Sequence, residues 1–280
     1  MSSLSADLIA AARRIGEALR PPPVARVLLP AAEPGPEGRG EFCAVQLGDG
    51  SAGLAYVLLG DARERLAAIP AASLAGEDAA ALAQGLRGDD AAGRSLGLAA
   101  LNALTRHLYQ RAGFAPDLAR DSLGDLALGP DDRLGMVGFF PPLVRRAREA
   151  GTPLLVLELK AELVQEAPGL TVTLDPSRLA ECTRVVCTST TLLNESLEAV
   201  LRHARGCREF VLVGPSAGCV PDPLFARGVT ALGGAWIRDP ALLFQRMERG
   251  ERWGEATAKS SLRRGAGWPG LPELLRRAAR

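Results

Sequence analysis

The feature that most constrains the fold is a change in sequence pattern near residue 133. Beyond that point, short apolar runs alternate with helical segments. These apolar runs contain few charges and comprise residues 133–137, 153–159, 184–187, 209–213 and 229–232. Runs of this kind are typical of parallel strands that helices cover on both faces of a sheet. The second half is therefore predicted to be a Rossmann-like α/β domain with a parallel sheet.

The first part of the chain has a different order of elements. A helical period over residues 7–19 ends at three prolines, three strand-like runs follow at 24–29, 42–47 and 54–59, and helices complete the segment up to residue 111. Strands that are segregated from helices indicate a smaller α+β domain. We predict this domain over residues 1–115, a linker rich in Pro, Gly and Asp over 116–132, and the Rossmann-like domain over 133–280.

Charge and cysteine usage limit the partners that the chain is expected to have. The formal net charge is +1, which argues against a nucleic acid or a membrane surface held by bulk electrostatics. The five cysteines contain no CxxC pair, and their odd count fits a reducing, cytoplasmic environment. The N-terminal segment reads as an amphipathic helix with charges inside its apolar stretch, not as a signal peptide. The sequence leaves the oligomeric state open, and a homodimer is one candidate because homodimers are common for such folds.

Ligands of open parallel sheets bind beyond the carboxyl ends of the strands, so the turns that follow the strands are the candidate site. After the first strand of the second half, Gly138 allows a tight turn and Pro141 begins a helix. Between them, Phe139 and Phe140 suit a flat organic ligand or a domain interface, and the alternative is that both rings pack in the core. The pattern is not the GxGxxG dinucleotide fingerprint.

Two further turns add polar groups at the same predicted edge. One carries hydroxyl groups and an amide that form either a helix cap or a polar ligand floor, and the other is a tight turn with a hydroxyl and free amides. Their candidate ligand-binding residues are Thr188, Ser189, Thr190 and Asn194 in the first turn, and Gly214, Pro215 and Ser216 in the second. Three polar turns on one edge make a ligand site more plausible than any of them does alone.

Three single residues have both a functional and a structural interpretation. Glu158 ends the second strand, where a carboxylate holds ribose hydroxyls in dinucleotide-binding domains, or it is a surface residue. Asn102 lies on an apolar helix and either lines the cleft or makes one buried hydrogen bond. Cys187 is a weak candidate metal ligand. A lone cysteine is more often a small buried apolar residue, and the Cys and His spacing typical of zinc sites is absent from the sequence.

These residues also carry a resemblance to a known family. The sequence is similar to the heavy-metal chelation family, a Rossmann-like domain of unknown function preceded by an enolase N-terminal-like domain. The motifs that match are residues 135–143 (GMVGFFPPL), 191–194 (TLLN), 213–216 (VGPS), 224–228 (LFARG), 233–234 (GG), 239–240 (DP) and 95–103 (SLGLAALNA). The resemblance implies a site in the cleft between the two domains. It implies motif positions at Asn102, Gly138, Pro141, Pro142, Asn194 and Ser216.

Three classes of function follow from these observations. The first is a protein that binds a small molecule or a metal chelate between the domains, or an enzyme that acts on a metal-chelating metabolite. A transition-metal ion would arrive with the organic chelator or use few protein ligands. The second is a nucleotide- or S-adenosylmethionine-dependent enzyme in which Glu158 holds ribose. The third is a non-catalytic accessory protein of metallocluster assembly. The sequence does not choose among them, and it leaves the substrate, the metal and the reaction open.

Overall fold

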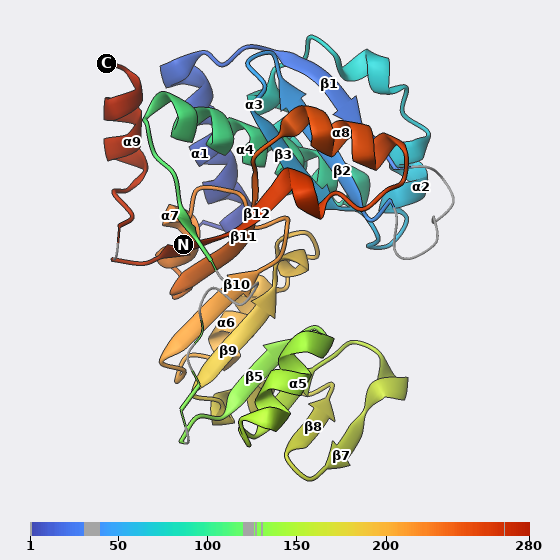
Figure 1. The fold of residues 1–280 in the computed structure, drawn as a ribbon, viewed down its shortest axis with the longest axis vertical. Coiled ribbons are helices and arrows are strands. Elements are labelled where there is room, and N and C mark those ends of the chain that lie inside the picture. Colours follow the sequence, from blue (N-terminus) through green and yellow to red (C-terminus); the bar gives the residue numbers. More distant parts are fainter. Residues whose placement is uncertain (1, 31–39, 120–125, 127, 130, 266) are drawn as a thin grey trace.

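The computed structural model describes residues 2–30, 40–119, 126, 128–129, 131–265 and 267–280. Much of the predicted linker, namely residues 120–125, 127 and 130, lies outside the described residues. Within the described part, three strands form a small antiparallel sheet and nine form a large one (Figure 1). None of the described helices combines the length and the apolar character that crossing a membrane requires.

The small sheet has the order β1-β2-β3 and packs against the long helix α4. Its part of the chain comprises α1 (Leu4–Leu19), β1 (Val24–Leu28), β2 (Phe42–Leu47), β3 (Ala52–Tyr56), α2 (Ala62–Ala67), α3 (Ala79–Leu82) and α4 (Ala91–Arg111). Helix α4 begins at the cap Asp90, whose carboxylate accepts from the N–H of Ala92 at 3.0 Å. Buried residues occur on all of its faces between Ser95 and Tyr109, as expected of a helix at the centre of a core.

The large sheet has the order β4-β12-β11-β10-β9-β5-β6-β8-β7. Its strands are β4 (Asp117–Leu118), β5 (Leu134–Val137), β6 (Leu154–Leu157), β7 (Gln165–Ala167), β8 (Leu170–Thr173), β9 (Arg184–Thr188), β10 (Glu209–Val213), β11 (Ala231–Ile237) and β12 (Thr257–Arg263). The six strands from β11 to β8 are parallel, and β12, β4 and β7 are added antiparallel to their neighbours. The predicted fold class, a mainly parallel α/β sheet with a smaller α+β part, is confirmed.

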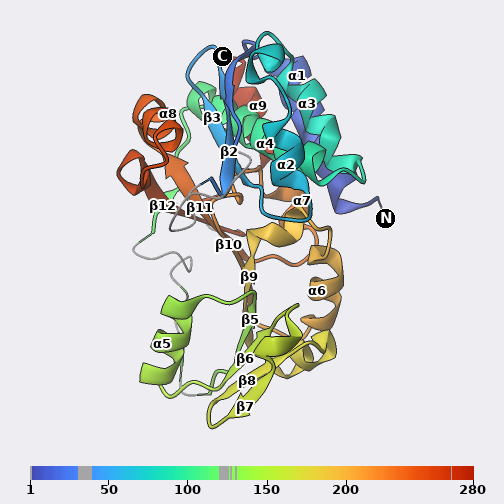
Figure 2. The ribbon, with the colours of Figure 1, turned by 90° about the vertical axis from the view of Figure 1, so that its right-hand side faces the viewer.

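Helices cover both faces of the large sheet. The helices of this part of the chain are α5 (Pro141–Glu149), α6 (Leu197–His203), α7 (Asp222–Phe225), α8 (Pro240–Glu248) and α9 (Leu271–Ala278). Figure 2 views the sheet nearly edge-on, with α5 on one side of it and α6 on the other. The order of the parallel strands reverses between β5 and β9, because the chain first builds β5, β6 and β8 outward and then returns to β9, β10 and β11. This reversal is the topological switch point at which doubly wound sheets place ligands.

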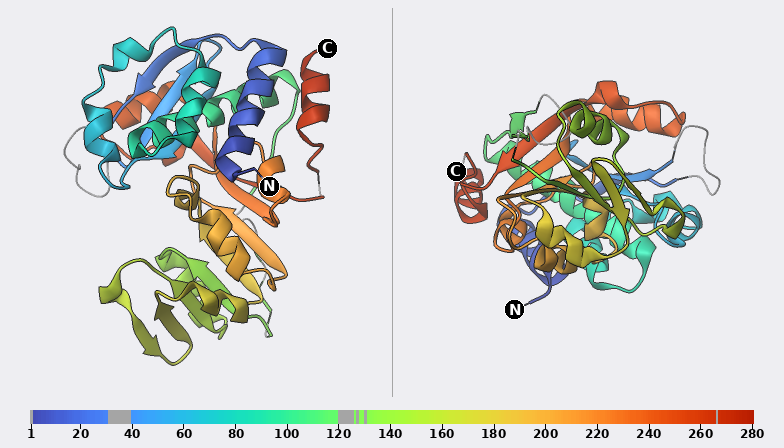
Figure 3. Two further views of the ribbon diagram at one scale, coloured as in Figure 1. Left: turned by 180° about the vertical axis from the view of Figure 1, so that it is seen from behind. Right: turned by 90° about the horizontal axis from the view of Figure 1, so that it is seen from below.

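The two halves of the chain share one core. A single cluster of buried side chains includes Leu8 and Leu104 from the first half and Val220, Leu232 and Leu274 from the second. The last helix, α9, returns to pack on α1 and α4, which the view from behind shows clearly (Figure 3). Helix α8 packs on β1, where the Arg26 guanidinium lies 4.0 Å from the centre of the Phe244 ring. The predicted domain boundaries at 115 and 133 stay a prediction.

Candidate functional site

The turns after β5 and β9 meet at the switch point. Gly138 has a φ of +84°, and a Cβ at this position would lie 3.1 Å from the Thr188 side-chain methyl. Thr188 in turn accepts a hydrogen bond from the N–H of Thr190 at 3.3 Å. The predicted residues Gly138, Thr188 and Thr190 are therefore brought together. The Thr188 methyl occupies the space beside Gly138.

The two adjacent phenylalanines have different environments. Phe139 is 45% exposed, whereas Phe140 packs against the buried cluster beneath α5. The Phe140 N–H donates to the Met136 sulfur at 3.3 Å, and Pro141 then begins α5. The core interpretation thus describes Phe140, and Phe139 is the ring that is open to a ligand or partner.

The turn after β9 also packs against the turn after β10. Gly214 has a φ of +137°, and a Cβ there would collide with the Ser189 hydroxyl. Ser189 is itself buried. Ser189 and Gly214 therefore lie side by side, and the space between them is filled by the protein's own atoms.

Asn102 and Ser216 join the two halves of the molecule. The Ser216 hydroxyl accepts from the N–H of Tyr56 at 3.0 Å. The Asn102 side-chain amide donates to the carbonyl of Leu54 at 2.7 Å and to that of Ser216 at 3.0 Å. Both side chains are buried, so these bonds fix β3 and α4 against the turn that follows β10.

Replacing Ser216 with alanine is expected to lower the free energy of unfolding by about 1–3 kcal/mol, because the Tyr56 N–H loses its acceptor in a partly buried position. Urea unfolding at pH 7 measures the change. Ser73 is exposed, and Ser73→Ala is the matched control with an expected change below about 0.5 kcal/mol. Equal stabilities of the two variants would show that Ser216 does not hold the halves together.

Two predicted residues make only local contacts. Asn194 is exposed, and its side-chain oxygen accepts from the N–H of Ser196 at 3.2 Å and from the Ser196 hydroxyl at 2.6 Å. The Glu158 carboxylate accepts from the N–H of the following Leu159 at 3.0 Å. Neither side chain takes part in the contacts of Asn102 and Ser216 described above. Their roles in ligand binding stay predictions.

A pocket lies where the two halves meet, between β3 and α4 on one side and β11, β12 and the turn after β10 on the other. Asn102 and Pro215 are the predicted residues that line it. Its cavity volume of about 40 Å³ holds a few water molecules, since one water needs roughly 10–15 Å³ on the same measure. The enclosed part therefore takes one small polar group of a ligand, and the remainder of a larger ligand would lie outside it.

The sequence interpretation missed the charged residue of this pocket. The guanidinium of Arg106 lies 3.6 Å from the centre of the Trp236 ring. Burial lowers the pKa of Arg106 below its ordinary value, and the negative charge of Asp49 offsets part of that shift. Arg106 and Tyr109 follow Asn102 at four and seven residues, which is one face of a helix. This spacing could have identified Arg106, but only if the helix face that carries Asn102 had been known to line the pocket.

Two polar atoms of the pocket-lining residues have no partner in the part of the chain that the structure describes. They are the side-chain oxygen of Asn102 and the hydroxyl of Tyr109, and both are buried. Burial raises the pKa of Tyr109 well above its ordinary value, so the phenol stays protonated. Buried polar groups without partners are uncommon and carry a free-energy cost. An acceptor and a hydroxyl are thus available to a bound molecule.

The environment of Cys187, the candidate metal ligand, does not suit that role. Cys187 is fully buried, desolvation raises the pKa of its thiol to about 12, and its sulfur lies 3.5 Å from the Thr191 hydroxyl oxygen. Among residues 2–30, 40–119 and the later described ranges, no three His, Cys, Asp or Glu side chains gather closely enough to hold an ion. These residues do not fit a metal held by protein ligands alone.

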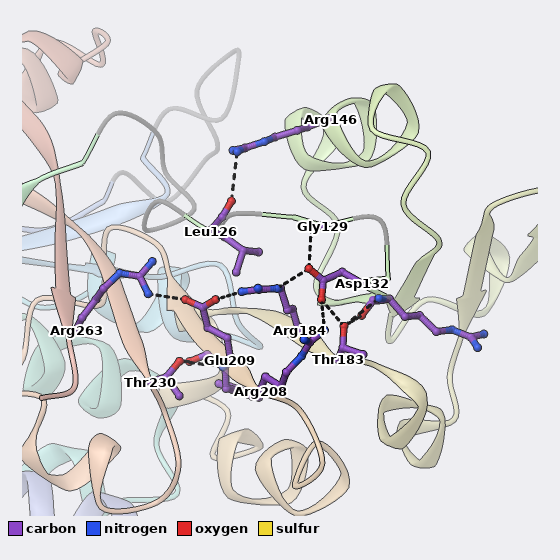
Figure 4. Close-up of polar contacts among 12 residues, drawn as sticks. Leu126, Gly129, Asp132, Arg146, Thr183, Arg184, Arg208, Glu209, Thr230 and Arg263 are labelled. Atoms are coloured by element: carbon purple, nitrogen blue, oxygen red, sulfur yellow. Dashed lines mark hydrogen bonds and ion pairs between the residues drawn. The ribbon is translucent and has the colours of Figure 1, made fainter. Parts of the chain in front are cut away.

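A dense charge network occupies the opposite end of the strands (Figure 4). The Asp132 side chain is 3% exposed and accepts from the Gly129 N–H, the Thr183 hydroxyl, Arg184 and Arg208 at 2.7–2.8 Å. Burial alone raises the pKa of Asp132, but these hydrogen bonds outweigh it and lower the value to about 2. Arg184 and Arg263 both pair with Glu209. Because ligands of such sheets bind at the other edge, we assign this network to stability.

The comparisons with known proteins agree with this architecture. Residues 122–264 match the family model DUF364 and residues 40–105 match DUF4213, both described as "Putative heavy-metal chelation". An uncharacterized protein of Methanocaldococcus jannaschii is 29% identical over 151 residues, which is 52% of this chain and 56% of that protein.

Two solved structures share the fold. Both are DUF364 proteins of unknown function. The one from Pyrococcus horikoshii has a TM-score of 0.68 at 18% identity and covers 93% of this chain and 100% of that chain. The one from Desulfitobacterium hafniense has a TM-score of 0.66 at 21% identity and covers 91% and 98%. Since the family model spans about half of the residues and the fold agrees, this chain belongs to the DUF364 family.

Proposed function

We propose that this chain binds a small organic molecule, free or as a metal chelate, in the pocket between its two halves. The observation that carries the proposal is the pair of buried, unpartnered polar atoms on Asn102 and Tyr109 beside the half-buried Arg106. A ligand that supplies partners to these groups removes the cost of leaving them unpaired. The family description, heavy-metal chelation, supports a ligand that is itself a chelator.

The donor set favours a metal that arrives already chelated. Cys187 is a protonated, buried thiol, and the residues that line the pocket include no Asp, Glu or His. Cys219 also lines the pocket, and burial raises the pKa of its thiol to about 12. A thiol binds metals as the thiolate, so neither sulfur is prepared to bind one. In this proposal the organic ligand supplies most of the metal-coordinating atoms.

The nucleotide alternative has a separate location. It would place a nucleotide at the reversal between β5 and β9, with Glu158 at the end of β6. The Thr188 methyl beside Gly138 and the local hydrogen bond of Glu158 both have to give way to a ribose-phosphate there. The pocket between the halves offers the unpartnered polar atoms of Asn102 and Tyr109, and we therefore prefer it.

The proposed location of the ligand is tested by a substitution that fills the pocket. Ser260 lies on β12 opposite Gly234 and lines the pocket, so Ser260→Phe is expected to weaken ligand binding at least about tenfold. Mass spectrometry of the purified protein identifies a co-purified molecule. Calorimetry then measures the affinity of the protein for that molecule. The same measurement is made with picolinate and citrate, each with and without Ni²⁺, and with adenosine and nicotinamide cofactors.

The matched control is Ser73→Phe, because Ser73 is exposed and distant in sequence from every pocket residue. Circular dichroism and thermal melting show whether both variants keep the wild-type fold. A ligand that binds wild type and Ser260→Phe with the same affinity contradicts the proposed location. Binding of adenosine cofactors that Glu158→Ala abolishes supports the nucleotide alternative instead.

A further inference from the structure

We propose that the ligand carries a carboxylate with a hydrogen-bond donor on the adjacent carbon, such as a 2-hydroxycarboxylate, and that Arg106 binds the carboxylate while the Asn102 side-chain oxygen accepts from the donor. This inference rests on the proposed function, because it concerns the same pocket. It assigns a ligand class that neither the family description nor the solved relatives specify.

Arg106 has the donors for such a contact and uses none of them within the described residues. The Trp236 ring covers one face of its guanidinium, which leaves the N–H groups at the edge of the plane as the available contacts. No hydrogen bond or ion pair joins Arg106 to any side chain or carbonyl that the structure describes. An arginine offers five N–H donors in a plane, and a carboxylate matches two of them at once.

The charges around Arg106 compensate its positive charge only in part. Asp49 is the acid that acts on it electrostatically, but the Asp49 oxygens bond His107 at 2.6 Å and Ser51 at 3.0 Å. The other side chains of the pocket are neutral. A half-buried cation without a hydrogen-bonded anion is costly, and one carboxylate neutralises one guanidinium. A phosphate dianion is commonly met by several cations or a helix N-terminus, which the pocket lining does not provide.

Asn102 supplies the second half of the recognition. Its side-chain nitrogen already donates to the carbonyls of Leu54 and Ser216, which fixes the orientation of the amide. The side-chain oxygen then has no donor among the described residues. Asn102 and Arg106 are four residues apart on α4, and such positions lie about 5–6 Å from each other on a helix surface. Both residues line the pocket, so one ligand that carries a carboxylate and a neighbouring hydroxyl or amine can meet both of them.

The test compares acids that differ by one hydroxyl. Calorimetry measures citrate against tricarballylate and malate against succinate on the wild-type chain, with inorganic phosphate as the anion control. We expect the two hydroxy acids to bind about tenfold more tightly than their partners that lack the hydroxyl, because the buried Asn102 oxygen then gains a donor. Phosphate is expected to bind more weakly than either hydroxy acid.

Arg106→Gln is expected to raise the Kd of the hydroxy acids about 10- to 100-fold, which is the range of a charged hydrogen bond. Arg106→Lys keeps the charge without the planar fork and is expected to fall between wild type and Arg106→Gln. Arg14→Gln on the exposed face of α1 removes the same charge and is expected to change nothing. Thermal melts accompany each variant, and the wild-type acid series stands on its own if Arg106→Gln fails to fold.

Several results overturn the inference. They are failure of all four acids to bind wild type at millimolar concentration, equal affinities for citrate and tricarballylate, phosphate binding as tight as citrate, or unchanged affinity in Arg106→Gln. If a ligand still binds and Ser260→Phe abolishes its binding, the carboxylate inference fails and the proposed function stands. If Ser260→Phe has no effect on a ligand that binds, the proposed function fails as well.

Discussion

Asp132→Ala is expected to lower the free energy of unfolding by about 3–5 kcal/mol, which is the usual cost of removing one partner from a buried ion pair. Asp132 accepts hydrogen bonds from Arg184, Arg208 and Thr183 in a position that solvent hardly reaches. Without this carboxylate, Arg184 keeps only Glu209 as an anionic partner among the described residues. Urea unfolding at pH 7, followed by circular dichroism, measures the loss.

The neighbouring acid provides the control. Asp131 is exposed, and Asp131→Ala removes the same charge with an expected change within about 0.5 kcal/mol. If the two variants lose similar amounts of stability, the network in Figure 4 does not contribute what its burial indicates.

The same carboxylate gives the stability a defined pH dependence. The pKa of Asp132 is lowered from 3.8 to about 2 in the folded chain, so its contribution is fully present above about pH 4 and is lost as the pH falls toward 2. The difference in stability between wild type and Asp132→Ala should therefore narrow over that interval. A difference that stays constant from pH 7 to pH 2 would contradict the lowered pKa.

Gly53→Ala is expected to destabilise the protein by about 3 kcal/mol or more, because β3 packs directly on the backbone of α4 at this position. A Cβ at Gly53 would lie 2.7 Å from the backbone carbon of Asn102 and would also collide with Ala99 and Ala103. The obstruction is main chain in a central helix, so no side chain can move aside to relieve it. Thermal melting and urea unfolding measure the effect, and loss of soluble protein is its extreme form.

Gly206→Ala is the matched control, because a Cβ there meets nothing within 4 Å and its backbone is not in the left-handed region. Its expected change is within about 0.5 kcal/mol. A mild effect of Gly53→Ala would show that α4 can shift away from β3, and the alignment of Asn102 with Ser216 would then not depend on this contact.

Much of the fold could be predicted because the buried parallel strands have recognisable apolar sequences. β5, β6, β9 and β10 are buried along their whole length or nearly so, and their sequences contain the continuous apolar runs that parallel strands require. Among the elements that were missed, β7 and β12 are polar and lie toward the sheet edges. β12 has the sequence TAKSSLR, and β7 is fully exposed, so neither has an apolar period to detect.

The candidate site was only partly visible in the sequence, for a related reason. Asn102, Pro215 and Ser216 could be singled out as polar or turn residues in unusual places, and the structure brings them together where the halves meet. Arg106 is one of many arginines in the chain, and nothing in its neighbours separates it from a solvated one. Its position depends on Trp236, which lies 130 residues away in the sequence, and local patterns do not report contacts of that range.

The return of the final helix to the beginning of the chain determines how a solute reaches the pocket. Helix α9 rests on α1 and α4, and α8 rests on β1, so the polypeptide crosses from one half to the other more than once. A clamshell motion would require both helices to detach and would uncover their apolar faces, which is unfavourable in water. A solute would then enter and leave through small movements of the residues that line the pocket, Arg106 and Trp236 among them, and not by separation of the two halves.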